Sequence, residues 1–233
     1  MQNQVWIIKK YNEVTSTNDV AKVIAETDCS NTVILAEHQS LGRGRRGNSW
    51  ISQKGNLFFS QVFNHKSNIS ELVFVSSLSL LETIKSFYPS LNISIKWPND
   101  ILINDKKTAG ILIEKADNDM VIIGIGVNIS QSPKIEQVSY PTACIDETGE
   151  LDKDDFLLKY LSIFDNNYAI SMKDFNIIRE NWLKNVTRLN QKIKVKCKDK
   201  INDGIFKGID EQGFLLLEHN NKLTKISTGE VFF

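Results

Sequence analysis

The chain has 233 residues, of which 41% are hydrophobic and 24% are charged. This composition is typical of a globular protein that is long enough for one sizeable domain and a small second one. Its 28 basic and 28 acidic side chains cancel, so no overall field draws the protein to nucleic acid or to a membrane. The N-terminus has no signal-peptide pattern, and no run of about 18 apolar residues occurs. We therefore expect a cytoplasmic protein without a membrane partner.

The three cysteines, Cys29, Cys144 and Cys197, lie far apart in the chain. An odd number of cysteines at such spacings predicts neither a disulfide framework nor a metal site. A reducing compartment is the natural interpretation.

The first structural elements are a short strand at residues 6–8 and a helix that begins near Ser16, Thr17 and Asn18. Two interpretations of these three polar residues stay open. They are typical helix caps. They are also the hydroxyl and amide groups that would bind a polar, uncharged ligand head such as a urea or an amide.

Residues 42–47 read Gly-Arg-Gly-Arg-Arg-Gly and are followed closely by Trp50. Glycines allow a ligand to approach the backbone, and arginines supply forked donors, so the segment predicts an anion-binding loop. The pattern G-x-G-x-x-G is not a dinucleotide fingerprint here, because no strand leads directly into it and no helical period follows. We expect a mobile loop. A solvated basic surface loop is the alternative.

The middle of the chain predicts a sheet backed by a long helix. Apolar patterns indicate strands at 57–63, 93–96, 101–103, 109–114 and 120–129 and a helix at 70–87. The last four strands are joined by short connections, so they must be antiparallel neighbours. Pro98 interrupts the first pair and leaves Lys96, Asn99 and Asp100 at a strand end.

Three glycines, Gly110, Gly124 and Gly126, stand inside these predicted strands. Glycine weakens a strand unless something packs against the bare backbone. A flat ligand lying on the sheet is one explanation, and a β-bulge or a tight strand crossing is the other.

The last third of the chain has a different pattern of predicted elements. An irregular segment at 130–150 precedes two amphipathic helices at 152–168 and 173–183. From residue 191, apolar residues alternate with Lys192, Lys194, Lys196 and Lys198, which indicates a half-buried strand with a basic outer face. Further short strands follow, so we expect a small barrel at the C-terminus. Its charge is too mixed to indicate a nucleic-acid module.

Five motifs occur in a fixed order: the polar helix start, the glycine-arginine loop, Lys96-Trp-Pro-Asn-Asp100, Lys107 with Ala109-Gly110, and Gly124-Ile-Gly-Val-Asn128. Together they resemble the biotin protein ligases, in the form without an N-terminal DNA-binding domain, over nearly the whole chain. The resemblance implies an α+β fold with a mixed, largely antiparallel sheet and helices, similar to class II aminoacyl-tRNA synthetases, over residues 1–186. It implies a small SH3-like β-barrel over residues 187–233.

The resemblance also implies a reaction. Such ligases make biotinyl-5′-AMP from biotin and MgATP and then transfer biotin to one lysine of the carrier domain of a biotin-dependent carboxylase. Magnesium would arrive with the nucleotide rather than at a fixed protein site. A homodimer is possible. No specific DNA binding is expected, because too few residues precede Ser16 for a winged helix.

The matching positions imply roles for individual residues. Arg43 and Lys107 would hold the biotin carboxylate against the α-phosphate, and Asp100 would orient or deprotonate the acceptor lysine, although an Asp in a turn is often only a turn former. The segment 130–141, where the family encloses adenine, matches only loosely, and we name no adenine-stacking residue there. Biotin would contact Ser16, Thr17, Asn18, Gln39, Gly42, Arg43, Gly44, Lys107, Gly110 and Gly126. ATP would contact Arg45, Arg46, Trp50, Lys96, Asn99 and Asn128.

Two rival functions remain at the level of the sequence. A lipoate ligase on a related fold would bind an extended acyl chain, and the arginine-rich loop speaks against it. A non-enzymatic nucleic-acid-binding protein would use the same arginines, and the neutral total charge speaks against that.

Overall fold

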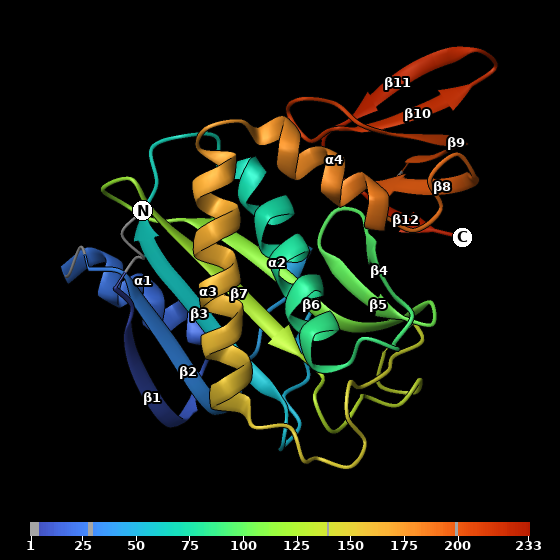
Figure 1. Ribbon diagram of the computed structural model, residues 1–233. Coiled ribbons are helices and arrows are strands. Elements are labelled where there is room, and N and C mark those ends of the chain that lie inside the picture. The colour runs from blue at the N-terminus through green and yellow to red at the C-terminus, as the bar shows by residue number, and fades with distance from the viewer. Residues whose placement is uncertain (1–4, 28–29, 139, 199) are drawn as a thin grey trace.

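A computed structural model describes residues 5–27, 30–138, 140–198 and 200–233. They form a seven-stranded sheet in the order β1-β2-β3-β7-β6-β5-β4 and a separate five-stranded sheet (Figure 1). Within the described residues, β1 and β2 form the one parallel pair of the larger sheet, which confirms the mixed, largely antiparallel fold. The strands are β1 (Ile7–Val14), β2 (Thr32–Gln39), β3 (Leu57–Asn64), β4 (Ile93–Lys96), β5 (Asp100–Ile103), β6 (Lys106–Lys115) and β7 (Met120–Val127).

The predicted meander is confirmed, since β4, β5, β6 and β7 are consecutive antiparallel neighbours. In the turn between β5 and β6, Asn104 and Asp105 have φ of 50° and 62°, a left-handed conformation that Asn and Asp tolerate better than most residues. The first strand is longer than predicted. It runs to Val14 because its backbone pairs in parallel with β2 along its length, although few of its side chains are buried.

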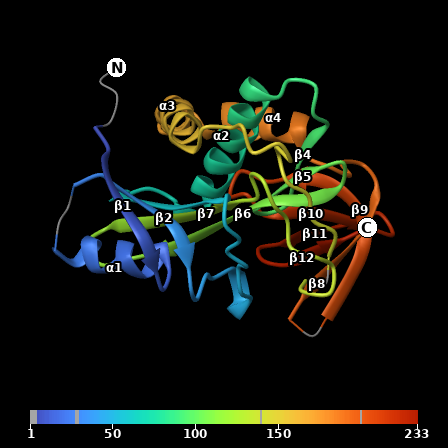
Figure 2. The ribbon, with the colours of Figure 1, turned by 90° about the horizontal axis from the view of Figure 1, so that it is seen from below.

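Helices cover both faces of the larger sheet. The predicted helices are confirmed as α1 (Thr17–Thr27), α2 (Leu72–Phe87), α3 (Lys153–Ser171) and α4 (Phe175–Asn185), with short 3-10 turns η1 (Arg45–Gly47) and η2 (Ile69–Glu71). Figure 2 shows α2, α3 and α4 on one face and α1 on the other. The main core lies under α2 and α3, where Phe59, Phe63 and Phe164 are fully buried. A smaller apolar cluster joins Ala21 and Ile24 of α1 to the opposite face.

The second sheet contains β8 (Lys192–Cys197), β9 (Lys200–Ile209), β10 (Leu215–His219), β11 (Lys222–Ile226) and β12 (Glu230–Phe232), in the order β11-β10-β9-β8-β12. Along β8, Ile193 and Val195 are buried and the alternating lysines are exposed, as predicted. The order has two free ends, so the sheet is open, which is consistent with an SH3-like domain. β12 pairs with β8, and it leads the C-terminus back toward β4 and β5 of the larger sheet (Figure 1).

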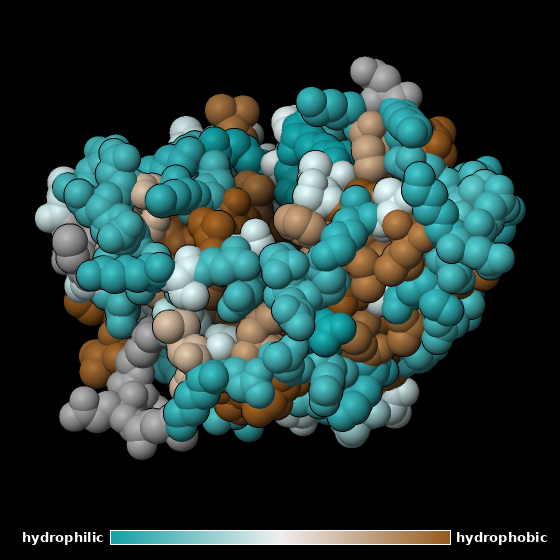
Figure 3. All heavy atoms as spheres, turned by 90° about the horizontal axis from the view of Figure 1, so that it is seen from above, coloured by the Kyte–Doolittle hydropathy of each residue, from teal (hydrophilic) through white to brown (hydrophobic). Residues whose placement is uncertain are grey.

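The surface is mixed in character. On the face seen in Figure 3, hydrophilic side chains dominate and hydrophobic ones lie in separate clumps. Among the described residues, none of the helices combines the length and the apolar character needed to cross a bilayer. Cys144 and Cys197 are free cysteines, and Cys29 lies outside the described residues.

Candidate functional site

A cavity of about 480 Å³ lies between the start of α1, the glycine-arginine loop, strands β4 to β7 and the end of β12. A volume of this size suits a small-molecule ligand. Gly42 and Asn128 are absent from its lining. The other residues predicted for the site line it together: Ser16, Thr17, Asn18, Gln39, Arg43, Gly44, Arg45, Arg46, Trp50, Lys96, Asn99, Asp100, Lys107, Gly110 and Gly126.

One end of the cavity is polar, uncharged and buried. Ser16, Thr17 and Asn18 at the start of α1 are each at most 3% exposed, and Gln39 from the end of β2 is 8% exposed. Gln39 Oε1 accepts a hydrogen bond from the backbone N–H of Thr17 at 2.9 Å and lies 3.2 Å from its hydroxyl. The first turn of α1 is therefore capped from a neighbouring strand. The buried groups at this end suit a neutral hydrogen-bonding ligand head.

The glycine-arginine loop, residues 42–47, is folded back on itself at its base. Gly44 N–H donates to Asn48 O at 2.7 Å, and Trp50 N–H donates to Gly42 O at 2.9 Å. The 3-10 turn η1 stands inside the loop. A Cβ on Gly42 would lie 2.6 Å from the backbone oxygen of Trp50. Gly42 therefore keeps the base of the loop closed instead of lining the cavity.

The three arginines of this loop are held in two places, Arg43 beside α1 and the other two beside the second sheet. Arg43 forms ion pairs with Asp19 at 2.7 Å and with Glu114 at 3.1 Å. Arg45 donates to Asn99 Oδ1 at 2.9 Å, and both Arg45 and Arg46 donate to the hydroxyl of Thr228 in the second sheet's β11–β12 connection. Burial and the neighbouring Arg46 lower the pKa of Arg45. An anion beside these arginines would offset both the burial and the mutual repulsion.

Side chains of the protein itself pack against the glycines of β6 and β7. Gly110 and Gly126 face each other across β6 and β7, whose pairing is continuous there. A Cβ on Gly126 would lie 2.4 Å from the indole of Trp50, and a Cβ on Gly110 would lie 2.9 Å from it. Gly124 makes room for the amide of Asn18 in the same way. The glycines are thus explained by close packing, and neither a bulge nor a strand crossing is needed between β6 and β7.

Trp50 therefore lies against the two glycines predicted to contact biotin, although the sequence placed it with ATP. Its Nε1 is buried and has no hydrogen-bond partner among the described residues. A buried donor without a partner is costly, so this atom is available to an acceptor on a ligand.

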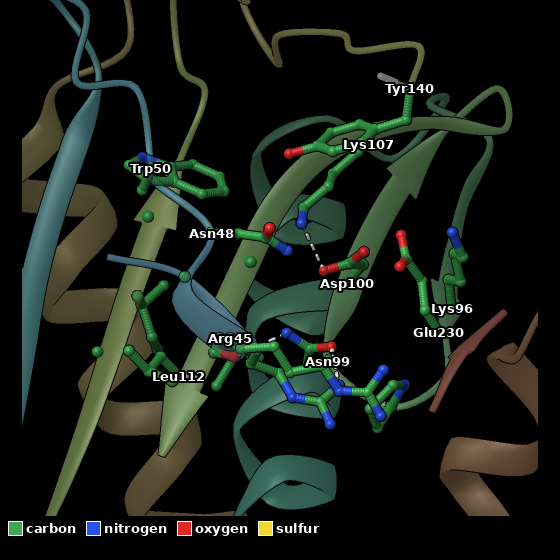
Figure 4. A pocket seen from close by; sticks show the side chains of 18 of the residues that line it. Arg45, Asn48, Trp50, Lys96, Asn99, Asp100, Lys107, Leu112, Tyr140 and Glu230 are labelled. Atoms are coloured by element: carbon green, nitrogen blue, oxygen red, sulfur yellow. Dashed lines mark hydrogen bonds and ion pairs between the residues drawn. The ribbon is translucent and has the colours of Figure 1, made fainter. Parts of the chain in front are cut away.

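Lys107 and Asp100 form an ion pair in the middle of the cavity (Figure 4). Lys107 Nζ is 2.8 Å from Asp100 Oδ1, and the two side chains are 18% and 17% exposed. The ammonium also lies 5.6 Å from the ring centre of Trp50 and 5.0 Å from that of Tyr140. Burial lowers the pKa of Lys107, but Asp100 and Tyr140 outweigh it and leave this pKa above its usual value. Lys107 is a fixed positive charge at neutral pH.

Residues at the C-terminus line one side of the cavity, and the sequence did not predict them there. Glu230, Phe232 and Phe233 line the cavity, and Figure 4 shows Glu230 beside Lys96. The Lys96 ammonium lies 5.6 Å from the ring centre of Phe233, and burial lowers its pKa below the usual value. Arg188 stacks on Phe233 at 4.4 Å. No local motif marks these residues, because only the packing of the two sheets brings them to the site.

Asn128 lies behind the cavity. It is 1% exposed, and its Nδ2 donates to Ala143 O at 3.3 Å. It therefore braces the segment after β7 from outside. Among the described residues, no group of three or more His, Cys, Asp and Glu side chains has the geometry to hold a metal ion.

Comparisons with known proteins agree over the whole chain. Residues 11–128 match the Biotin/lipoate A/B protein ligase family, and residues 189–233 match the Biotin protein ligase C terminal domain. The chain is 33% identical to the biotin--[acetyl-CoA-carboxylase] ligase of Paracoccus denitrificans, over 94% of this chain and 97% of the relative. It is 31% identical to the bifunctional ligase/repressor BirA of Bacillus subtilis, over 95% of this chain and 72% of the relative.

The solved structures agree as well. The biotin protein ligase of Aquifex aeolicus in complex with biotin and ATP superposes with a TM-score of 0.83 at 29% identity, over 100% of this chain and 98% of that one. The family match covers the loop and the meander, and the C-terminal domain match covers the part of the cavity lined by β12. The chain therefore belongs to the biotin/lipoate A/B protein ligase family, and residues 189–233 form its biotin protein ligase C-terminal domain.

Proposed function

We propose that this protein is a biotin protein ligase, which activates biotin with MgATP to biotinyl-5′-AMP and transfers biotin to a lysine of a biotin carboxyl carrier domain. One observation carries the proposal. A single cavity joins a buried, uncharged polar end at Thr17 and Gln39 to a group of cations that includes Arg45 and Lys96. The first end suits the ureido head of biotin, and the second suits the phosphates of ATP. The relatives named above support the same activity.

The first step must bring two anions together. A carboxylate and a phosphate about 4 Å apart repel by about 4 kcal/mol per pair of charges at an effective dielectric near 20. Arg43 and Lys107 both line the cavity, so they can offset this repulsion while the carboxylate oxygen attacks the α-phosphate. Catalysis of this step is then mainly positioning and electrostatic stabilisation. Pyrophosphate leaves with its magnesium.

The second step needs a nucleophilic amine. We assign to Asp100 the role of receiving or orienting the acceptor lysine, because its carboxylate borders the cavity beside Lys107. An entering lysine ammonium competes with Lys107 for this carboxylate. A carboxylate within hydrogen-bond reach can take a proton as the amine attacks the biotinyl carbonyl. AMP is the leaving group.

The residue roles follow the lining of the cavity. Biotin is assigned to Ser16, Thr17, Asn18, Gln39, Arg43, Gly44, Lys107, Gly110 and Gly126. ATP is assigned to Arg45, Arg46, Lys96 and Asn99. Trp50 borders both substrates, and Gly42 and Asn128 act from outside the cavity by bracing the loop and the segment after β7. We take residues 1–186 as the catalytic domain and residues 187–233 as the C-terminal domain.

The remaining assignments concern partners and place. We infer a carrier domain of a biotin-dependent carboxylase as acceptor, a cytoplasmic location and no sequence-specific DNA partner. Lysines on the outer face of β8 can neutralise phosphates but cannot read bases. DNA binding should therefore be weak and lost at moderate salt. A homodimer stays a possibility, which sedimentation of the purified protein would test.

The decisive experiment is ATP–pyrophosphate exchange with biotin and with lipoate side by side, followed by transfer of biotin to a carrier domain. Biotin should support exchange and lipoate should not. The exposed Lys159 on α3 offers a matched control for lysine substitutions at the site. Exchange without biotin, or with lipoate alone, would refute the proposal.

A further inference from the structure

Glu114 on β6 stands directly behind the polar end of the cavity without lining it. Its side chain is 22% exposed. Oε2 accepts a hydrogen bond from Asn18 Nδ2 at 2.6 Å and another from Arg43 Nη2 at 3.1 Å. Oε1 lies 3.2 Å from Lys22 Nζ. One carboxylate thus joins the start of α1 to the glycine-arginine loop.

The first consequence concerns the amide of Asn18. The amide can be turned end for end, and only its neighbours decide which atom points where. The Ser60 hydroxyl, 2.6 Å from Asn18 Oδ1, does not decide, because a hydroxyl can donate or accept. Glu114 decides, because an ionised carboxylate only accepts and would repel Oδ1. Glu114 therefore fixes Nδ2 toward itself and Oδ1 toward Ser60.

The orientation of the Asn18 amide affects the neighbouring hydrogen bonds at the polar end. The Ser60 hydroxyl also lies 2.7 Å from Thr17 Oγ1. Its single proton goes to Asn18 Oδ1, so the Thr17 hydroxyl donates to Ser60, and Gln39 Oε1, 3.2 Å from that hydroxyl, keeps the hydrogen bond from the backbone N–H of Thr17. The orientation of Asn18 therefore influences which groups at this end are donors and which are acceptors. A ureido head presents both N–H donors and a C=O acceptor, so it binds well to one arrangement and poorly to the reverse.

The second consequence concerns Arg43. Its guanidinium is held between Glu114 Oε2 and Asp19 Oδ1, the latter at 2.7 Å. Asp19 is 43% exposed, about twice the exposure of Glu114. An exposed ion pair contributes little, so Glu114 is the stronger of the two anchors. The hydrogen bonds from Asn18 and Lys22, with the charge of Arg43, outweigh burial and hold the pKa of Glu114 below its usual value.

We propose that Glu114 is a positioning residue for biotin, which sets the orientation of the Asn18 amide and ties Arg43 of the loop to the same oxygen. It touches neither substrate. The inference rests on the proposed function, and it links the polar end of the cavity to the cation that faces the biotin carboxylate. Glu114 thereby affects biotin binding in two ways, through Asn18 and through Arg43.

Glu114→Gln tests this directly. The substitution keeps the shape and a hydrogen bond to Asn18, but an amide can pair with either end of another amide, so the orientation is no longer selected. It also removes the charge that holds Arg43. The dissociation constant for biotin, measured by calorimetry, should rise about tenfold, as expected for the loss of one hydrogen bond to a charged group. The dissociation constant for ATP and kcat at saturating biotin should change much less.

Two further variants separate the contributions. Glu114→Asp keeps the charge one methylene shorter and should recover part of the biotin affinity. Asp19→Asn removes the other carboxylate beside Arg43 and leaves Asn18 unaffected, so its biotin affinity should stay within about twofold of wild type. Thermal unfolding of each variant checks the fold.

The outcomes are distinct. Equal losses of biotin and ATP affinity in Glu114→Gln would assign Glu114 a purely structural role and overturn the inference. Unchanged biotin affinity in an active enzyme would overturn the inference alone. Absence of biotin-dependent ATP–pyrophosphate exchange in the wild-type protein would overturn the proposed function, and this inference with it.

Discussion

Replacing Lys107 with Met should separate biotin binding from stability. The Lys107 ammonium is 2.8 Å from Asp100, and both side chains are less than one-fifth exposed. At this distance two unit charges interact by about 6 kcal/mol at an effective dielectric near 20, an upper bound because desolvation opposes it. Removing one partner of such a pair typically costs about 2 to 5 kcal/mol. We therefore expect Lys107→Met to lower the free energy of unfolding by about 2 kcal/mol.

The same substitution removes a cation that faces the biotin carboxylate. A loss of about 2 kcal/mol raises a dissociation constant about 30-fold. The effect on ATP should be several times smaller, because Arg45, Arg46 and Lys96 remain. Calorimetric titration of both substrates measures this difference, and Lys159→Met serves as the control.

A second substitution distinguishes the two effects. Asp100→Asn in the Lys107→Met background removes the unpaired carboxylate, so it should restore most of the stability in urea unfolding. It should not restore biotin affinity, because the cation is still absent. If the double variant regained both, Lys107 would act only as the partner of Asp100. If Lys107→Met left biotin affinity unchanged, the assignment of Lys107 to biotin would be wrong.

Three further predictions concern other parts of the site and fold. Gly126→Ala should raise the KM for biotin, because the new Cβ would lie 2.4 Å from the indole of Trp50. In a Trp50→Ala background the same change should add little, and an additional loss there would refute the steric explanation. Removal of Phe232 and Phe233 should raise the KM for ATP more than that for biotin in steady-state kinetics, because these rings pack beside Lys96; equal effects would contradict this. Asp146→Asn should cost at most about 2 kcal/mol in urea unfolding at pH 7, since hydrogen bonds from Thr148 lower the pKa of Asp146 from 3.8 to about 2. A depressed pKa stabilises the fold above pH 4, and this contribution is lost as pH falls through 2. The difference from wild type should therefore shrink to a small fraction of its pH 7 value by pH 2, and an undiminished difference there would contradict the reasoning.

Much of the larger sheet follows from local pattern. β3 and β7 are predicted correctly because apolar residues dominate both segments and the fold buries them on both faces. The meander follows from connections that are too short for a crossover. β1 is the exception. Most of its side chains are exposed, so apolar pattern ends at Ile8, whereas backbone pairing with β2 continues to Val14.

The site is predictable only where its chemistry is local in sequence. Residues 42–47 concentrate glycine and arginine in one segment, and Lys96, Asn99 and Asp100 flank one proline, so both motifs stand out. Glu230 and Phe233 carry no such signal, because β12 reaches the cavity only through its pairing with β8. The position of Trp50 on Gly110 and Gly126 depends on the fold of the loop and on the register of two strands. Neither can be deduced from a lone tryptophan.

The partners of the cations suggest why the two ends of the cavity receive different anions. Arg43 and Lys107 are each paired with a carboxylate of the protein, at 2.7 Å and 2.8 Å. An incoming biotin carboxylate must share these partners, so it gains less from the two cations than it would from unpaired ones. Biotin binding therefore depends on the buried polar end as well as on these cations.

The cations at the other end are not neutralised in this way. Among the described residues, no carboxylate forms an ion pair with Arg45, Arg46 or Lys96, and the partners of the two arginines are the neutral oxygens of Asn99, Thr228 and Lys196. Glu230 and Asp100 act on Arg45 and Lys96 only at longer range. The positive charge of these side chains is therefore available to a nucleotide with several negative charges. Because Arg45 and Arg46 reach this end of the cavity from the loop while anchored to Thr228, binding of phosphate should also tighten the contact between the loop and the C-terminal domain.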